Sequence, residues 1–181
     1  MNLVAGFAPF ILFTILSRLS VDLALWMAFA TAFVVTIRDF VESPSLRLLD
    51  VGSLLLFALL ALGRGFLDPG PSLASVRFIA ALVLFLLLGL PLALKRPFSV
   101  DYARLDPREA GWPPELFLRV NYLVSGAWTA AFAAMAVADG AVTFDAGLPL
   151  YASVAISLIA LASAITFTLR YPALAANRLN G

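Results

Sequence analysis

Long apolar stretches separated by short polar segments occupy almost the whole chain. A helix needs roughly 20 apolar residues to cross about 30 Å of hydrocarbon, and most of the stretches reach or approach that length. Gly, Pro, Ser and charged residues bound the stretches, as is typical of turns between helices. The pattern predicts helices at about residues 3–16, 21–37, 44–63, 73–94, 115–138 and 148–171.

The first stretch is shorter than a full span and contains Pro9. It would cross the bilayer only if Ser17 and Arg18 lie at the interface, with the Arg18 side chain extending toward water. If it does not cross, the segment is re-entrant and five helices span the membrane. Ser20 is the predicted N-cap of the second helix, because its hydroxyl can accept from the free N–H groups of the first turn.

The longest polar segment is a connector, residues 95–114, between the fourth and fifth predicted helices. Ser99 is the predicted cap of a short interfacial helix within it, and aromatic side chains such as those of the connector favour the headgroup region. The charges alternate in sign, which is typical of a solvated, salt-bridged surface; the alternative is a docking site for a partner. The candidate contact residues of that site are Phe98, Tyr102, Arg104, Arg108 and Trp112.

Composition places this chain in lipid. It has 181 residues, of which 62% are hydrophobic and 13% charged, whereas soluble domains are nearer half apolar and a quarter charged. We therefore expect an all-α integral membrane protein, a single domain of residues 1–181 with about six transmembrane helices. The formal net charge is only +1, so we expect no nucleic-acid partner. Cys and His are absent, and we predict neither a metal site nor a cofactor, and no enzymatic activity.

Lysine and arginine are distributed unevenly between the two sides of the predicted bundle. With six crossings, one side receives nine of the 12 basic residues, including those of the connector, and the other receives three. Basic residues are enriched in cytoplasmic loops. The count predicts that the connector and both termini are cytoplasmic; with five crossings, only the N-terminus changes side.

Three ionisable residues, Asp22, Asp50 and Arg77, are predicted to lie within the bilayer boundary. A charge at a helix centre costs about 2.5–3.5 kcal/mol on insertion scales, so such residues are functional candidates. Structural pairing is the simpler interpretation. Arg47 and Asp50 are three residues apart and can pair on one helix face, and Arg77 can extend its side chain to the outer interface.

The fifth predicted helix carries Asn121, Ser125 and Trp128 at positions i, i+4 and i+7, so they share one face. The face could line a polar cavity, or its polar groups could bond to a neighbouring helix. The sixth helix carries Ser153 and Ser157 at the same spacing. These serines predict a packing seam in which hydroxyls bond to carbonyl groups of their own helix, or else the lining of a pore.

Several short motifs resemble those of one family of bacterial inner-membrane proteins, the intracellular septation protein A-like proteins. The motifs are Gly6-Phe7-Ala8-Pro9-Phe10 with Phe13, Asp22 at the start of the second helix, Lys95-Arg96-Pro97-Phe98, and Arg119-x-Asn121 followed by Trp128 and Phe132. The chain departs from that pattern in its longer connector and in Phe117, where the resemblance leads us to expect Trp.

The resemblance implies a bacterial inner-membrane protein without catalysis. Its implied role is in cell-envelope maintenance or septation, through contacts with other inner-membrane envelope or division proteins. A second copy of the chain is a further candidate partner. No active-site residues follow from it. The alternative function is a small transporter or channel whose polar path is lined by the fifth and sixth helices.

Overall fold

The computed structural model describes residues 2–42, 47–67, 72–104 and 111–177, and all regular structure among them is helical. Five helices are long and apolar enough to cross a membrane. The predicted all-α membrane bundle is therefore confirmed, with five such helices. They are α3 (Val21–Glu42), α4 (Leu48–Leu62) with the π-helical turn η1 (Gly63–Leu67), α5 (Leu73–Ala93), α7 (Pro114–Thr143) and α8 (Leu150–Asn177).

The first apolar stretch forms two short helices, α1 (Asn2–Gly6) and α2 (Ala8–Leu16), that are interrupted at Phe7. Together they rise only about 22 Å at 1.5 Å per residue, less than the hydrocarbon thickness. Pro9 lies in the first turn of α2, where its missing N–H would have had no helical partner. The prediction of a sixth full-length span is therefore not confirmed.

The segment α1–α2 packs inside the protein rather than outside it. Phe10, Phe13 and Thr14 are buried, and α2 packs against α3 as a tight hairpin. The N–H of Leu23 donates to the Ser20 hydroxyl at 3.3 Å, which confirms Ser20 as the cap of α3.

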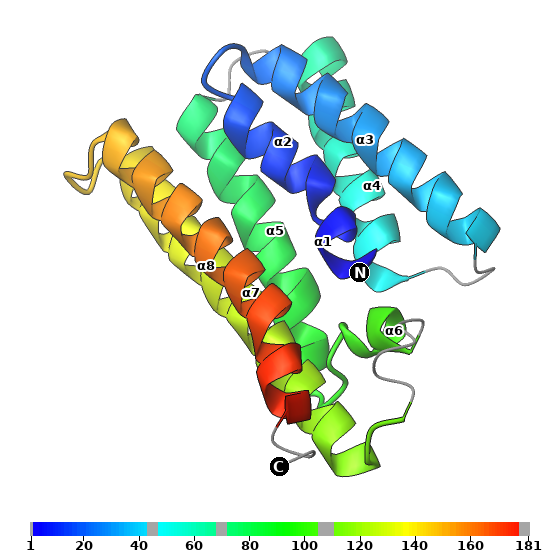
Figure 1. The fold of residues 1–181 in the computed structure, drawn as a ribbon. Coiled ribbons are helices and arrows are strands. Elements are labelled where there is room, and N and C mark those ends of the chain that lie inside the picture. Colours follow the sequence, from blue (N-terminus) through cyan, green and yellow to red (C-terminus); the bar gives the residue numbers. More distant parts are fainter. Residues whose placement is uncertain (1, 43–46, 68–71, 105–110, 178–181) are drawn as a thin grey trace.

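The helices form two groups that meet along α5 (Figure 1). Helices α5, α7 and α8 pack together in one group, α2, α3 and α4 in the other, and α4–α5 and α2–α8 contacts join them. The N-terminus, the start of α4, the short helix α6 (Val100–Ala103) and the end of α8 lie at one end, called here the connector end. The α2–α3 turn, the start of α5 and the α7–α8 loop lie at the other, the far end.

Aromatic rings fill the core where the two groups meet. Phe7 stacks on Trp128 with ring centroids 3.6 Å apart, and Phe10 meets Phe132 edge to face at 4.7 Å. Such contacts add to the stabilisation from buried area. Large apolar side chains also cover the outside: Leu59, for example, is 70% exposed and Val137 is 74% exposed. An outer surface of this kind suits lipid as the solvent.

Candidate functional site

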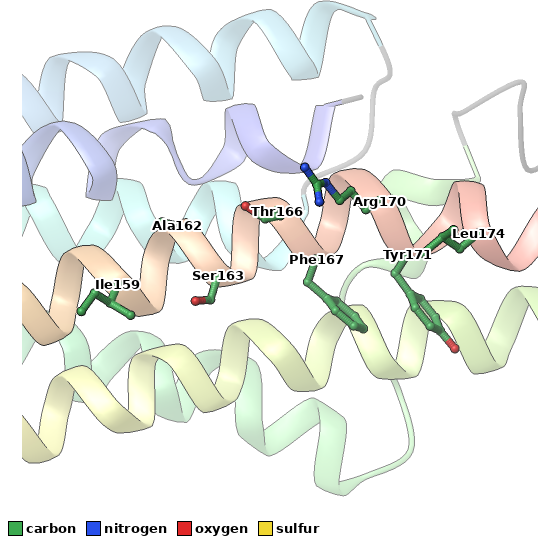
Figure 2. A pocket seen from close by; sticks show the side chains of 8 residues that line it. All are labelled: Ile159, Ala162, Ser163, Thr166, Phe167, Arg170, Tyr171 and Leu174. Atoms are coloured by element: carbon green, nitrogen blue, oxygen red, sulfur yellow. The ribbon is translucent and has the colours of Figure 1, made fainter.

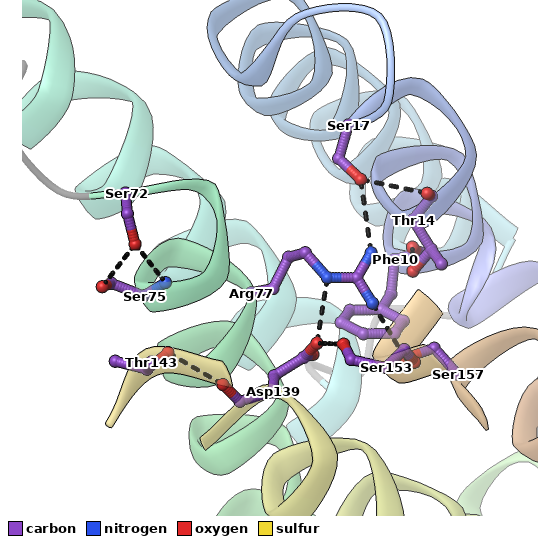
Figure 3. A network of polar contacts seen from close by, with 10 residues as sticks. All are labelled: Phe10, Thr14, Ser17, Ser72, Ser75, Arg77, Asp139, Thr143, Ser153 and Ser157. Carbon is purple, nitrogen blue, oxygen red and sulfur yellow. Dashed lines mark hydrogen bonds and ion pairs between the residues drawn. The ribbon is translucent and has the colours of Figure 1, made fainter. Parts of the chain in front are cut away.

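A buried ion pair lies near the far end of the bundle. Arg77, in the second turn of α5, donates from Nε to Oδ1 of Asp139 in α7 at 3.0 Å. Its Nη2 donates to the hydroxyl of Ser157 in α8 at 2.8 Å, and its Nη1 lies 3.5 Å from the Ser17 hydroxyl. Ser153 donates a short hydrogen bond to the same Asp139 oxygen. Figure 3 shows Asp139, Ser17 and Ser157 around the guanidinium group, with Ser153 bonded to Asp139.

This Arg77 cluster (Ser17, Arg77, Asp139, Ser153 and Ser157) is shielded from the surroundings. Arg77 is 3% exposed and Asp139 1%. Taking both charges out of water is costly, and the cost is recovered only when each charge is paired and its remaining polar atoms are hydrogen-bonded. All three guanidinium nitrogens have a partner here. The cluster therefore fixes α5, α7, α8 and the end of α2 relative to one another.

Two sequence-based expectations about this cluster are wrong. Arg77 does not extend to the outer interface, because its side chain points into the bundle toward Asp139. Asp139 was expected in a loop after a helix ending at Ala138, but α7 continues to Thr143 and carries Asp139 on its buried face. Close packing with α5 follows at Gly140, where an added Cβ would lie 3.1 Å from the Phe78 ring. The predicted bond from Ser157 to the Ser153 carbonyl is confirmed at 3.0 Å.

A second ionic cluster lies at the connector end. Nη1 of Arg47 lies 2.5 Å from Oδ2 of Asp39, at the end of α3, and 3.9 Å from Oδ2 of Asp50 in α4. Arg38 donates to the other Asp39 oxygen. The predicted pair of Arg47 with Asp50 is therefore confirmed, but Asp39 is the closer partner, and no spacing in the sequence indicates that contact.

Tyr102 of α6 completes this Arg47 cluster (Arg38, Asp39, Arg47, Asp50 and Tyr102). Its hydroxyl donates to Oδ1 of Asp50 at 2.8 Å, and its ring lies 4.7 Å from the Arg47 guanidinium carbon. Burial raises the pKa of the Tyr102 hydroxyl, and the neighbouring Asp50 carboxylate raises that pKa further. Tyr102 therefore stays protonated as a donor. Nε and Nη2 of Arg47 are buried and make no hydrogen bond within the described structure.

The predicted polar face of α7 binds the connector. The N–H of Ser99 donates to the Ser125 hydroxyl at 3.2 Å, the Ser125 hydroxyl donates to Oγ of Ser99 at 3.0 Å, and Oγ of Ser99 donates to Oδ1 of Asn121 at 2.8 Å. Ser99 was expected to cap α6, but its side chain makes no cap bond. Trp128 donates from Nε1 to Thr168 of α8 at 2.9 Å. The polar groups of this face are thus bonded to protein, as the packing interpretation requires.

The predicted contact residues of the connector, and Asp22, divide between the surface and the core. Asp22 is 66% exposed and pairs with Arg64 at 2.6 Å at the far end. Phe98 and Tyr102 are buried in the core, so they correct the expectation that both present a contact surface. Arg104 is exposed, and Trp112 is half-buried against the core. Arg108 lies outside the described residues.

A shallow hollow of about 560 Å³ follows the surface of α8 (Figure 2). Its lining is mostly apolar, and the rings of Phe167 and Tyr171 stack with centroids 4.7 Å apart. Arg170 is the one charged residue among the described residues that line it. The hollow offers hydrophobic contact rather than the convergent polar groups that chemistry on a substrate needs.

The described residues include no group of three or more carboxylates placed to hold a metal ion. Comparison with known proteins adds no assignment: no family model, curated protein or solved structure matches the chain.

Proposed function

We propose that this chain is a non-catalytic multi-pass protein of the bacterial inner membrane, acting in cell-envelope maintenance or septation through contacts with other membrane proteins. The motif resemblance suggests the biological role. One observation favours an interaction role over transport. The polar face of α7 that could have lined a transport path is buried and bonded to protein atoms; it consists of Asn121, Ser125 and Trp128.

A fixed shape supports an interaction role. The Arg77 cluster joins α2, α5, α7 and α8 at the far end, and the Arg47 cluster joins α3, α4 and α6 at the connector end. Breaking either cluster to move helices would leave charges unpaired in a low-dielectric interior, at a cost of several kcal/mol. A bundle held in this way presents constant surfaces to its partners.

We further propose that the connector end faces the cytoplasm. The basic residues Arg38, Arg47, Lys95, Arg96 and Arg104 belong to this end, whereas the far end has Arg18, Arg64 and Arg77. The positive-inside tendency supports this orientation. Both chain ends would then also be cytoplasmic, because α1 begins and α8 ends at the connector end. With five crossings the N-terminus was expected on the other side, but α1 and α2 together run from the connector end to the far end although they are too short for a full span.

One observation favours transport as a second candidate. Buried ionisable residues in membrane proteins often belong to ion or proton pathways, and Asp139 of α7 is buried with Arg77 and the Ser153 hydroxyl as its partners. A transporter would have to open this cluster during its cycle. Ion or solute flux into proteoliposomes that is abolished by Asp139→Asn would establish that function in place of the interaction role.

Site-specific photo-crosslinking in native membranes tests the proposal. A crosslinking amino acid replaces exposed Gly111 at the connector end and, as the matched control, exposed Tyr151 at the far end. We expect envelope or division proteins to be captured from position 111 and not from 151. Equal capture from both positions, or capture of unrelated proteins alone, contradicts the proposal.

A further inference from the structure

A hollow of about 370 Å³ opens at the connector end, between the start of α4, the end of α5, α6 and the start of α7. Its apolar lining residues include Leu48 and Leu118. Among the residues that the structure describes, its charged lining residues are three cations, Lys95, Arg96 and Arg104, and one carboxylate, Asp101. We call it the basic hollow. The excess of positive charge makes it attractive to an anion.

The three cations are available to bind an anion. Lys95, Arg96 and Arg104 are exposed, and none of them forms an ion pair with another described residue. Arg47 and Arg77 differ in this respect, since both are buried against carboxylates. The protein therefore uses two arginines to hold its helices together and leaves these three cations at the surface of one hollow.

The backbone around the hollow is anchored. Directly after α5, Lys95 adopts a left-handed conformation with φ 60°, and the N–H of Arg96 donates to the Pro91 carbonyl at 2.8 Å. Phe98 follows in the core, edge to face with Phe7 at 5.9 Å. Left-handed backbone is costly for a residue with a side chain and persists only where the surroundings impose it. The turn thus holds two cations beside the hollow.

The third cation, Arg104, follows helix α6 directly, and buried side chains of that helix fix its position. Tyr102 points into the Arg47 cluster and Ala103 is buried, so the next residue, Arg104, is presented to the hollow. Removing any of the three cations leaves this anchoring intact, because it depends on Phe98, Ser99 and Tyr102.

The basic hollow also lies at the depth of lipid headgroups. The span in α4 begins at Leu48 and the span in α5 ends at Ala93, so the hollow is at the boundary between hydrocarbon and water. Leu90 and Leu94, near the same end of α5, are 66% and 67% exposed and offer an apolar wall to acyl chains. We propose that the basic hollow binds the phosphate-bearing headgroup of an anionic phospholipid. Basic pockets between transmembrane helices bind such headgroups through charge-assisted hydrogen bonds.

Native mass spectrometry of the full chain in detergent tests this site, with added phosphatidylglycerol as the probe and phosphatidylcholine as the neutral comparison. We expect the unaltered protein to retain phosphatidylglycerol preferentially. Each cation near an anionic lipid contributes about fivefold in affinity, so the combined variant Lys95→Gln, Arg96→Gln and Arg104→Gln should lose roughly a hundredfold. Arg119→Gln, an exposed cation of α7 that does not line the hollow, should bind like the unaltered protein.

A second variant separates a built site from general attraction to positive charge. Leu118→Trp keeps every cation but adds volume at the wall of the hollow, and we expect it to reduce phosphatidylglycerol retention as well. Equal retention by the unaltered protein and both variants overturns the proposal. Displacement of the lipid by millimolar inorganic phosphate would assign the site to a soluble anion and overturn the choice of a lipid. This site is independent of the role proposed above.

Discussion

Nε of Arg77 donates to the carboxylate of Asp139 at 3.0 Å, although 62 residues separate the two along the chain. Both side chains are buried, and three serine hydroxyls complete the surroundings. The pair joins the start of one spanning helix to the end of another. It therefore ties α5 to α7 at the far end.

Removing one partner of this pair should be strongly destabilising. Asp139→Ala leaves the Arg77 charge buried without a counter-ion, and we expect a loss of about 3–5 kcal/mol in the free energy of unfolding. Arg77→Met combined with Asp139→Leu removes both charges and should recover much of the loss. Unfolding in mixed detergent micelles, followed by circular dichroism, measures the difference. A single variant as stable as the unaltered protein would contradict the structural role of the pair.

Tyr102→Phe tests the link between the connector and α4. The substitution keeps the ring over Arg47 and removes only the hydrogen bond to Asp50. A buried acceptor that loses its donor costs about 1–3 kcal/mol, and the same unfolding measurement should detect that loss. Tyr151→Phe is the control, because Tyr151 is 78% exposed. Equal stability of the two variants would mean that the hydroxyl of Tyr102 does not stabilise the fold.

The same residue predicts a dependence of stability on alkaline pH. The pKa of Tyr102 is raised in the folded protein, so the folded state holds this proton more tightly than the unfolded state. Its contribution is complete below the unfolded pKa of about 10 and is lost as pH rises toward the folded pKa. Thermal unfolding midpoints between pH 8 and 11 should therefore fall less steeply in Tyr102→Phe than in the unaltered protein. Identical slopes would exclude this coupling.

Ser125→Ala tests whether the polar face of α7 holds the connector. It removes both hydrogen bonds that join Ser125 to Ser99. We expect faster hydrogen–deuterium exchange in residues 99–104, because fewer contacts then oppose local opening, with little change in α5. Ser163→Ala on the exposed side of α8 is the matched control. Unchanged exchange in residues 99–104 would show that these bonds do not hold the connector.

Hydropathy was sufficient for the long helices because a run of about 20 apolar residues has few other stable forms. It was not sufficient for the first segment, since an apolar run buried in protein resembles one buried in lipid. Phe10 packs against the ring of Phe132, and Phe13 packs against the ring of Phe57, so these apolar side chains contact protein and not lipid. The short length of this segment and its Pro9 were the only features of the sequence that indicated two short helices instead of a full span.

The ionic contacts were predictable only where the two partners are close in sequence. Arg47 is the residue just before α4 and Asp50 lies in the first turn of that helix, so their separation of three residues brings them together. Arg77 and Asp139 meet only through packing of α5 on α7, which no spacing rule encodes. The predicted helix ends at residue 138, but a paired carboxylate such as that of Asp139 can continue a span. The serines at 153 and 157 were the one local hint of a polar neighbour.

The most direct test of the central claim, a membrane bundle whose connector and far ends lie on opposite faces, is thiol labelling in intact bacterial cells. The chain contains no cysteine, so Gly111→Cys at the connector end and Ala146→Cys in the α7–α8 loop each introduce a single exposed thiol. A membrane-impermeant maleimide should label Ala146→Cys in intact cells, and Gly111→Cys only after lysis. Labelling of Gly111→Cys in intact cells, or identical labelling of both positions, would contradict the account.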